Sequence, residues 1–303
     1  MRAVVLYEYG DVDKLRMETD QQEPPFGPNE VRVRVRATSV NPVDWKIRSG
    51  AARKRMPVEF PAILGRDLAG EVVDSGRDVQ GFRKGMRVMA LANGTYAEFT
   101  TVRADMLAPI PERLGFVQAA ALPLVLTTGA QLMERAVKVQ PGWRVLVTGA
   151  VGSVGRTAVH VARKHGAQVT AGVRSRQRAE AETLGADRVV ALDDEAEVAL
   201  LRDFDAIADT VGGQTIVKLL HALKAGGVLG SVLGVPEAAE GKDIRVEAIM
   251  AQPDASRLYQ LADDVARGEF SIPIARTFRL EDARQAQELA EKEHPGGKVL
   301  LVA

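Results

Sequence analysis

Small residues with a fixed spacing occupy the stretch from Thr148 to Gly155, and they are typical of a turn that binds a pyrophosphate. The pattern Ala150-x-Gly152-x-x-Gly155 corresponds to the fingerprint G-x-G-x-x-G with alanine in first place. In that fingerprint the small residues permit a tight turn, close approach of the backbone to a pyrophosphate, and close packing of a helix on a strand. The residues predicted to bind a dinucleotide here are Ala150, Val151, Gly152, Ser153, Val154 and Gly155.

The elements around this turn must form a strand and a helix for the prediction to hold, because spaced glycines alone also occur in plain loops. The apolar run Val145–Val147 before the turn predicts a strand buried on both faces. A helix is expected over Thr157–His165 after it. The free amides at the helix N-terminus then face the phosphates of the ligand.

The end of the next predicted strand, Gln168–Ala171, indicates which dinucleotide is bound. NAD-binding folds carry an Asp or Glu about twenty residues past the glycines, where it binds the ribose 2′-hydroxyl. Here the chain continues with Gly172, and the guanidinium groups that follow suit charge-assisted bonds to a 2′-phosphate. The sequence therefore predicts NADPH as the cofactor, with a solvated basic turn as the open alternative. The residues predicted to bind the 2′-phosphate are Arg174, Ser175, Arg176 and Arg178.

Composition excludes several classes of function. The 303 residues exceed what one hydrophobic core usually supports, so two domains are expected. The 40 basic residues balance the 40 acidic ones, which argues against a nucleic-acid partner and against a membrane surface. Cysteine is absent, which excludes disulfides, thiolate nucleophiles and cysteine-based zinc sites.

The apolar runs of the chain are short. The apolar stretch within residues 1–8 is too short for a signal peptide, because a charged residue follows it at once. The longest apolar run, Ala119–Leu126, contains Pro123. We therefore expect a soluble protein in the cytoplasm.

The order of strand and helix signals predicts an α/β protein whose first domain is completed by the end of the chain. Residues 1–122 carry strand signals and predict an antiparallel, partly closed β-barrel-like catalytic domain. Residues 123–255 alternate strand and helix, which predicts a doubly wound parallel Rossmann domain. Residues 256–303 resemble the first part again and are expected to return to the catalytic domain.

Six further motifs accompany the glycine turn in a fixed order along the chain. They are Val40–Lys46, Gly65–Val73 with Gly76, Val79, Phe82 and Gly85 behind it, Gly94–Phe99, Ala119–Pro123, Asp209–Gly213 and Gly297–Val299. In these seven motifs the chain resembles the medium-chain dehydrogenase/reductase superfamily, specifically its zinc-independent quinone oxidoreductase and alkenal reductase branch, and the resemblance covers essentially the whole chain.

This resemblance also shows a departure from the zinc-dependent relatives. Those carry a catalytic cysteine near position 40 and Gly-His-Glu near 65, where this chain has Asn41 and Gly65-Arg66-Asp67. Oxidising an alcohol needs a Lewis acid for the alkoxide, whereas reducing a polarised C=C or a quinone needs only donors for the developing oxyanion. We therefore expect no metal site.

The resemblance implies roles for several further residues. Lys46 is expected to be catalytic, as a donor to the substrate oxygen or to a cofactor oxygen, with a solvated surface lysine as the alternative. Thr127 is expected to bind the nicotinamide part of the cofactor, with a helix cap as the alternative. Asn41 and Asp44 are expected to hold the turn before Lys46. Three further residues complete the predicted cofactor site: Val211, Gly212 and Leu233.

Other polar residues are expected to be structural. Asp205 and Asp209 border a turn at a strand end, and Tyr96 belongs to a motif that stabilises the barrel. The histidines lack metal-ligand spacing and are expected at the surface or in packing: His160, His165, His221 and His294.

Two hypotheses of function follow. The first is an NADPH-dependent oxidoreductase, a homodimer by resemblance, that transfers hydride to a quinone or to the C=C of an α,β-unsaturated carbonyl without zinc. The second is an NADPH-binding structural or redox-sensing protein with little turnover, because the fingerprint indicates binding and not chemistry.

Overall fold

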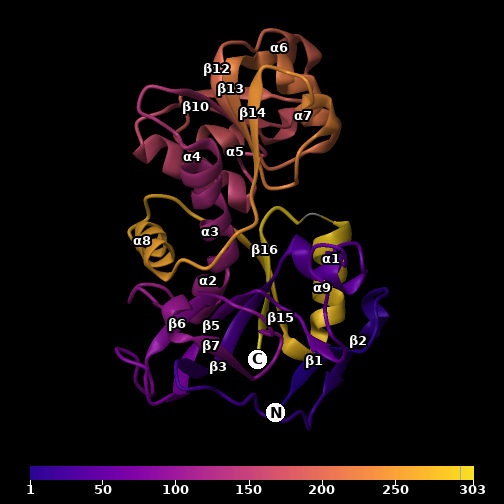
Figure 1. Ribbon diagram of the computed structural model, residues 1–303, viewed down its shortest axis with the longest axis vertical. Coiled ribbons are helices and arrows are strands. Elements are labelled where there is room, and N and C mark those ends of the chain that lie inside the picture. Colours follow the sequence, from indigo (N-terminus) through magenta and orange to yellow (C-terminus); the bar gives the residue numbers. More distant parts are fainter. Residues whose placement is uncertain (294) are drawn as a thin grey trace. The chain divides into compact units, whose positions relative to one another are not determined.

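The computed structural model describes residues 1–293 and 295–303, and the chain divides into two compact units. The first unit contains Met1–Leu124 and Pro253–Ala303, and the second contains Val125–Gln252. The two units share no sheet, and each is described by itself (Figure 1). His294 lies outside the described residues.

The second unit is built on a six-stranded parallel sheet with the order β11-β10-β9-β12-β13-β14. In Figure 1 helices α4, α6 and α7 surround its strands. Chain order reverses between β9 and β12, and ligands of doubly wound sheets bind at such a point, beyond the carboxyl ends of the strands. The elements are α3 (Pro123–Gln131), which begins in the first unit, a π-helical segment (Leu132–Val137), β9 (Arg144–Thr148), α4 (Ser153–Lys164), β10 (Gln168–Val173), α5 (Arg178–Glu182), β11 (Arg188–Ala191), α6 (Glu195–Ala199), β12 (Phe204–Asp209), α7 (Gly213–Leu219), β13 (Leu223–Ser231) and β14 (Ile244–Ala248).

The central strands β9 and β12 of this sheet are mostly buried, as expected for a parallel sheet with helices on its faces. Val145, Leu146 and Val147 of β9 are fully buried, as the apolar run predicted. Helix α4 begins at Ser153, earlier than the predicted Thr157, because the small residues of the turn also form the first turn of the helix. The edge strand β14 lies in a region where the sequence predicted no element.

The first unit holds a mostly antiparallel seven-stranded sheet. Its order is β15-β16-β3-β5-β6-β8, with β7 also paired to β3, and only β15 and β16 pair in parallel. A smaller sheet has the order β2-β1-β4. The elements are β1 (Ala3–Leu6), β2 (Leu15–Glu18), β3 (Glu30–Val40), α1 (Pro42–Arg48), β4 (Ala62–Ile63), β5 (Asp67–Ser75), β6 (Arg87–Leu91), β7 (Phe99–Arg103), β8 (Ala108–Pro109), α2 (Phe116–Ala120), α8 (Ala255–Ala266), β15 (Ile274–Arg279), α9 (Ala283–Lys292) and β16 (Lys298–Val302).

Strand β3 organises the first unit. Its valines Val31, Val33 and Val35 are at most 2% exposed, so the alternating pattern places them in the core, as predicted. The end of β3 pairs with β16, which Figure 1 draws in yellow beside the indigo and magenta strands. Strand β16 therefore completes the sheet that β3 begins.

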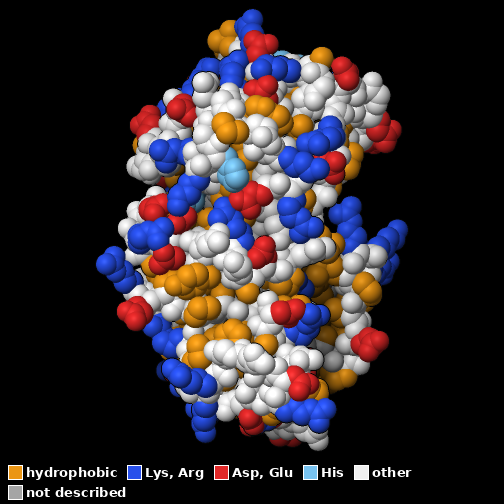
Figure 2. Space-filling view, turned by 60° about the vertical axis from the view of Figure 1, so that its left-hand side comes forward, with side chains coloured by type: hydrophobic (Ala, Val, Ile, Leu, Met, Phe, Trp, Pro, Cys, Tyr) orange, Lys and Arg blue, Asp and Glu red, His pale blue; other side chains and the backbone are white. Residues whose placement is uncertain are grey.

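The surface carries both signs of charge. Figure 2 shows Lys and Arg side chains interspersed with Asp and Glu side chains on the face that it draws. Within the described part of the chain, every helix is too short or too polar to cross a membrane.

Candidate functional site

The glycine turn after β9 is closed so tightly that its last position accepts only glycine. Gly149 has a φ of +62°, a conformation that residues with a side chain rarely adopt. A Cβ atom on Gly155 would lie 2.2 Å from the carbonyl oxygen of Gly149, which is backbone and cannot move aside. The small residues therefore let the start of α4 pack directly on the end of β9.

The N-terminus of α4 offers free amide groups at this turn. Its N-cap residue is Gly152, which has no side chain to accept a bond from the first amides of the helix. The amides of Ser153, Val154 and Gly155 therefore point out of the helix without a capping group. An uncapped helix start of this kind fits a phosphate.

The loop after β10 presents two exposed cations. Arg174 and Arg176 are exposed, and the charge of Arg174 helps to lower the pKa of the neighbouring Asp193 carboxyl. Gly172 is buried, and a Cβ there would lie 2.8 Å from the side chain of Leu192. The strand end thus lacks a carboxylate and is followed by exposed guanidinium groups.

The other two predicted residues of this loop already have partners. Arg178 forms an ion pair with Glu197 and donates to the carbonyl of Val189 at 3.3 Å. Ser175 donates its backbone amide and its hydroxyl to Asp193, at 2.7 and 2.8 Å. These bonds lower the pKa of the Asp193 carboxyl. Both residues hold the loop in place, and the sequence pattern gave no sign of Asp193.

The loops after β12 and β13 meet beside the glycine turn. A Cβ on Gly149 would lie 2.6 Å from Thr210 Oγ1, and one on Gly212 would lie 2.7 Å from the side chain of Leu233. Val211 is 45% exposed and Leu233 is 43% exposed, although both are apolar. The predicted cofactor residues Val211, Gly212 and Leu233 therefore come together at the carboxyl end of the sheet, where they form an apolar wall.

Asp209 holds these strand ends together, which is the structural role expected for it. It is 1% exposed and accepts bonds from Thr148 Oγ1 at 2.9 Å and Ser231 Oγ at 3.0 Å. It also accepts the amides of Val211 and Gly212. The ends of β9, β12 and β13 are thus tied by one carboxylate.

Thr127 carries a buried hydroxyl without a partner. The residue is 3% exposed, and its Oγ1 makes no hydrogen bond with the described residues. It lies on α3, which packs on α4 so closely that a Cβ on Gly129 would lie 2.5 Å from Thr157 Cβ. A buried donor left unpaired is costly, and a ligand that accepts its bond removes that cost.

Helix α1 of the first unit carries Lys46. The backbone N–H of Asn41 donates to Asp44 Oδ2 at 2.8 Å, as in the capping box that starts the helix. Lys46 is exposed, and its ammonium has no hydrogen bond or ion pair with the described residues. Asn41 and Asp44 thus hold the turn before Lys46, the structural role predicted for them.

Asp67 lies in the interior of the first unit and receives donors from several elements. It is 0% exposed, and it accepts Asn41 Nδ2 at 2.8 Å and the Leu124 amide at 2.6 Å. Ser39 Oγ also donates to it. The ammonium of Lys298, which is 6% exposed, lies 3.4 Å from Asp67 Oδ2 and 2.5 Å from Asn41 Oδ1.

A second buried carboxyl lies nearby. Tyr96 donates its hydroxyl to Asp44 Oδ2 at 3.1 Å, while Asp44 Oδ1 has no partner in the described part of the chain. Burial raises the pKa of Asp44 to about 7, and burial together with the neighbouring Asp44 charge raises the pKa of Tyr96. Tyr96 is 0% exposed and packs in the core of the unit, as a stabilising residue would.

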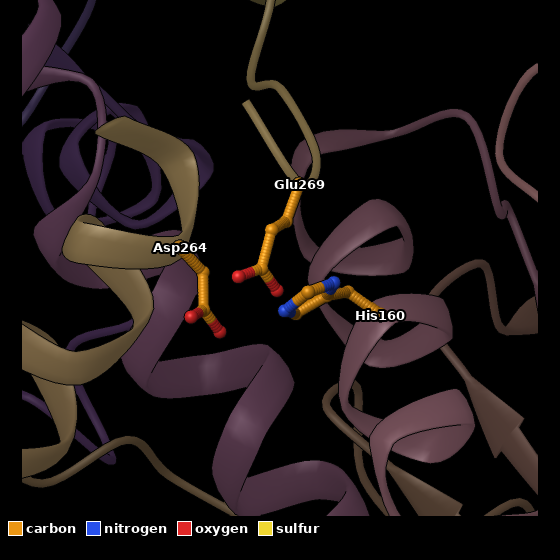
Figure 3. A group of neighbouring side chains, drawn as sticks. All are labelled: His160, Asp264 and Glu269. Atoms are coloured by element: carbon orange, nitrogen blue, oxygen red, sulfur yellow. The ribbon is translucent and has the colours of Figure 1, made fainter. Parts of the chain in front are cut away.

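The described histidines include one buried residue. His160 lies on α4 of the second unit and is 5% exposed, whereas Asp264 and Glu269 belong to the first unit, on α8 and in the turn after it (Figure 3). Because these side chains belong to separate units, we assign no metal site to them. His165 and His221 are exposed and bind Glu134 and a helix carbonyl.

Known proteins share this combination of a dinucleotide-binding sheet and an antiparallel unit. A family described as "Alcohol dehydrogenase GroES-like domain" matches residues 27–112, and one described as "Zinc-binding dehydrogenase" matches residues 184–301. Both descriptions are of oxidoreductases, so the fold and the site define a dehydrogenase or reductase that uses a nicotinamide cofactor.

Individual relatives identify the family. The NAD(P)H oxidoreductase RTN4IP1 of mouse mitochondria is 32% identical, over 99% of this chain and 89% of the relative. The 2-methylene-furan-3-one reductase of tomato is 34% identical, over 73% of this chain and 60% of the relative. The quinone oxidoreductase of Escherichia coli, solved in complex with NADPH, is 25% identical with a TM-score of 0.85, over the whole of both chains. The chain therefore belongs to the medium-chain dehydrogenase/reductase superfamily and is similar to its quinone oxidoreductases.

Proposed function

We propose that the protein reduces a quinone or the C=C of an α,β-unsaturated carbonyl, with NADPH as the preferred cofactor and without a catalytic zinc. The observation that carries the cofactor part is the loop after β10, where Arg174 and Arg176 are exposed and no carboxylate ends the strand. The names of the quinone and enone reductases among the relatives support the substrate class.

The residues of the second unit fit a dinucleotide. The uncapped start of α4 suits the pyrophosphate, Val211 and Leu233 give an apolar wall, and the unpaired hydroxyl of Thr127 suits a carboxamide or ribose oxygen. The reduced nicotinamide supplies the hydride when it is bound. In our proposal Lys46 donates a hydrogen bond to the substrate oxygen as negative charge develops on it.

The first unit does not fit the zinc that one family description implies. Of the positions where zinc-dependent relatives carry Cys and Gly-His-Glu, Asn41 binds Lys298, Arg66 is a cation, and Asp67 is already bonded on several sides. A fixed ammonium beside these groups repels a divalent ion, and no thiolate is available to bind one. These features support catalysis without zinc.

The test is oxidation of NADPH, followed at the absorbance band of the reduced cofactor, against a panel of quinones, alkenals and cyclic enones. We expect turnover with at least one class, with NADPH preferred to NADH. NADPH binding without turnover of any panel member would favour the alternative, a structural or redox-sensing protein.

We also propose that the protein acts as a homodimer in the cytoplasm. Strand β14 ends the sheet of the second unit, and an edge strand is open to pairing with another chain. Light scattering during size-exclusion chromatography measures the mass of the particle, and a monomer at assay concentration would refute the dimer.

A further inference from the structure

The buried ammonium of Lys298 has all of its donors in use. An ammonium has three N–H groups, and Lys298 Nζ lies near three acceptors: Asn41 Oδ1 at 2.5 Å, the Val40 carbonyl at 3.4 Å and Asp67 Oδ2 at 3.4 Å. Burial of an ammonium is costly unless it is paired and hydrogen-bonded in this way. The acceptors around Lys298 Nζ therefore stabilise a positive charge at this position.

The buried carboxylate of Asp67 depends in turn on Lys298. Lys298 is the only basic side chain in ion-pair contact with Asp67 among the residues that the structure describes, and both are buried. Asp44, the other buried carboxyl nearby, accepts from Asn41 and Tyr96 instead. Lys298 and Asp67 are thus each other's counter-charge inside the unit.

The residues that bind the Lys298–Asp67 ion pair lie at the starts of two helices. Asn41, which binds both Lys298 and Asp67, is the N-cap of α1, the helix that carries Lys46. The amide of Leu124, which donates to Asp67 at 2.6 Å, lies in the first turn of α3. The same helix carries Thr127. One ion pair is therefore bonded to the helix of the residue expected to donate to the substrate or cofactor oxygen, and to the helix of the residue expected to bind the nicotinamide part of the cofactor.

We propose that Lys298 is a positioning residue for the reduction: as a fixed internal cation, it holds Asn41 and Asp67, and through them the starts of α1 and α3. This inference rests on the proposed function, because Lys46 and Thr127 matter only if the protein reduces a substrate. Lys298 acts through other residues and forms no bond with substrate.

Loss of the ammonium leaves a buried carboxylate without its counter-charge. The bonds at Asn41 and Leu124 then rearrange, and the helices that begin there move with them. A displacement of about 1 Å at a reacting group lowers a rate by up to about 100-fold. Loss of both charges together is milder, because no buried charge is left uncompensated.

The experiment compares Lys298→Met, Asp67→Asn and the double variant with the wild-type holoenzyme. Lys224→Met is the matched control, because Lys224 forms an exposed ion pair with Asp205 at 2.7 Å in the second unit. Each protein is assayed for kcat per active site, counted by NADPH titration, with the best substrate of the panel. Urea unfolding is measured in parallel.

We expect Lys298→Met to lower kcat about 10- to 100-fold. The double variant should exceed Lys298→Met in kcat by about tenfold, which is the coupling expected for residues in contact. Lys224→Met should stay within about twofold of the wild type, as for an exposed pair. If Lys298→Met is recovered only unfolded, the inference requires that the double variant fold.

Three outcomes would overturn the inference. The first is a Lys298→Met variant with wild-type kcat per active site, even if its urea midpoint falls, because a purely structural lysine predicts that result. The second is additivity of the two single substitutions in the double variant. The third is a double variant that fails to fold. The urea experiment needs no activity, so a wild type without turnover would refute the proposed function and leave the ion-pair coupling measurable.

Discussion

Replacement of Arg174 and Arg176 by alanine should convert the protein from a strong to a weak discriminator between NADPH and NADH. Both guanidinium groups are exposed, at the end of a strand that lacks a carboxylate. Their only expected ligand is the 2′-phosphate, which NADH lacks. The substitutions should therefore weaken NADPH binding and leave NADH binding unchanged.

The magnitude follows from the exposure of the two groups. A hydrogen bond between charged partners contributes about 1.5–3 kcal/mol, and exposure to solvent places these bonds at the lower end. Since about 1.4 kcal/mol corresponds to a factor of ten, each substitution should raise the Kd of NADPH about tenfold, and both together about 100-fold.

The assay is titration of each cofactor into the wild type, the two single variants and the double variant. Calorimetry or cofactor fluorescence measures the binding. Arg178→Ala is an informative comparison, because its guanidinium is paired with Glu197 and should affect stability more than cofactor preference. Arg77→Ala, with a side chain 83% exposed in the first unit, controls for loss of one positive charge. Equal affinities of the wild type for the two cofactors, or equal losses for both in the double variant, would refute the reasoning.

Three further predictions concern the first unit. Lys46→Met should lower kcat and kcat/KM together by about 10²–10³-fold with unchanged NADPH affinity, as for loss of one oxyanion donor; an effect on KM alone would show that Lys46 binds substrate and transition state alike. Prolonged dialysis against a chelator should leave turnover unchanged, and activity that is lost and then restored by zinc would reveal a metal site. The pKa of Asp44 rises from 3.8 to about 7 on folding, so the neutral carboxyl stabilises the folded state below about pH 4, and this contribution is lost as the pH rises toward 7. The free energy of unfolding, measured with urea at pH 5, 6 and 7, should therefore fall with rising pH more steeply in the wild type than in Asp44→Asn, by up to about 1.4 kcal/mol per pH unit. Equal pH dependence in the two proteins would contradict a buried neutral carboxyl.

Much of the fold could be predicted because its elements are determined by local patterns. The alternation of valine with charge in β3 and the apolar run of β9 each match one strand environment. Strand β14 could not be predicted, since most of its residues are exposed and an edge strand needs no apolar pattern. Its position comes from pairing with β13 and not from its own sequence.

One part of the candidate site could be predicted because backbone geometry requires a particular residue type there. Gly155 is required because of a close backbone approach, which the spacing of small residues indicates. Asp193 and Lys298 act through partners far away in the sequence, Ser175 and Asp67 respectively, and no local pattern links such pairs. Likewise, the sequence did not distinguish Arg178, which forms an ion pair with Glu197, from the other arginines of the same loop.

The path of the chain has a consequence for the order of events on the ribosome. The second unit is one continuous segment, Val125–Gln252, so it can fold as soon as that segment has been synthesised. The sheet of the first unit cannot be completed then, because β16 lies between β15 and β3. Until β16 has been synthesised, the edge of β3 that pairs with it, around Val40, has no partner strand. During synthesis the second unit can therefore be folded while the first unit still needs protection from aggregation, so chaperones should be most important between the completion of Gln252 and the synthesis of β16.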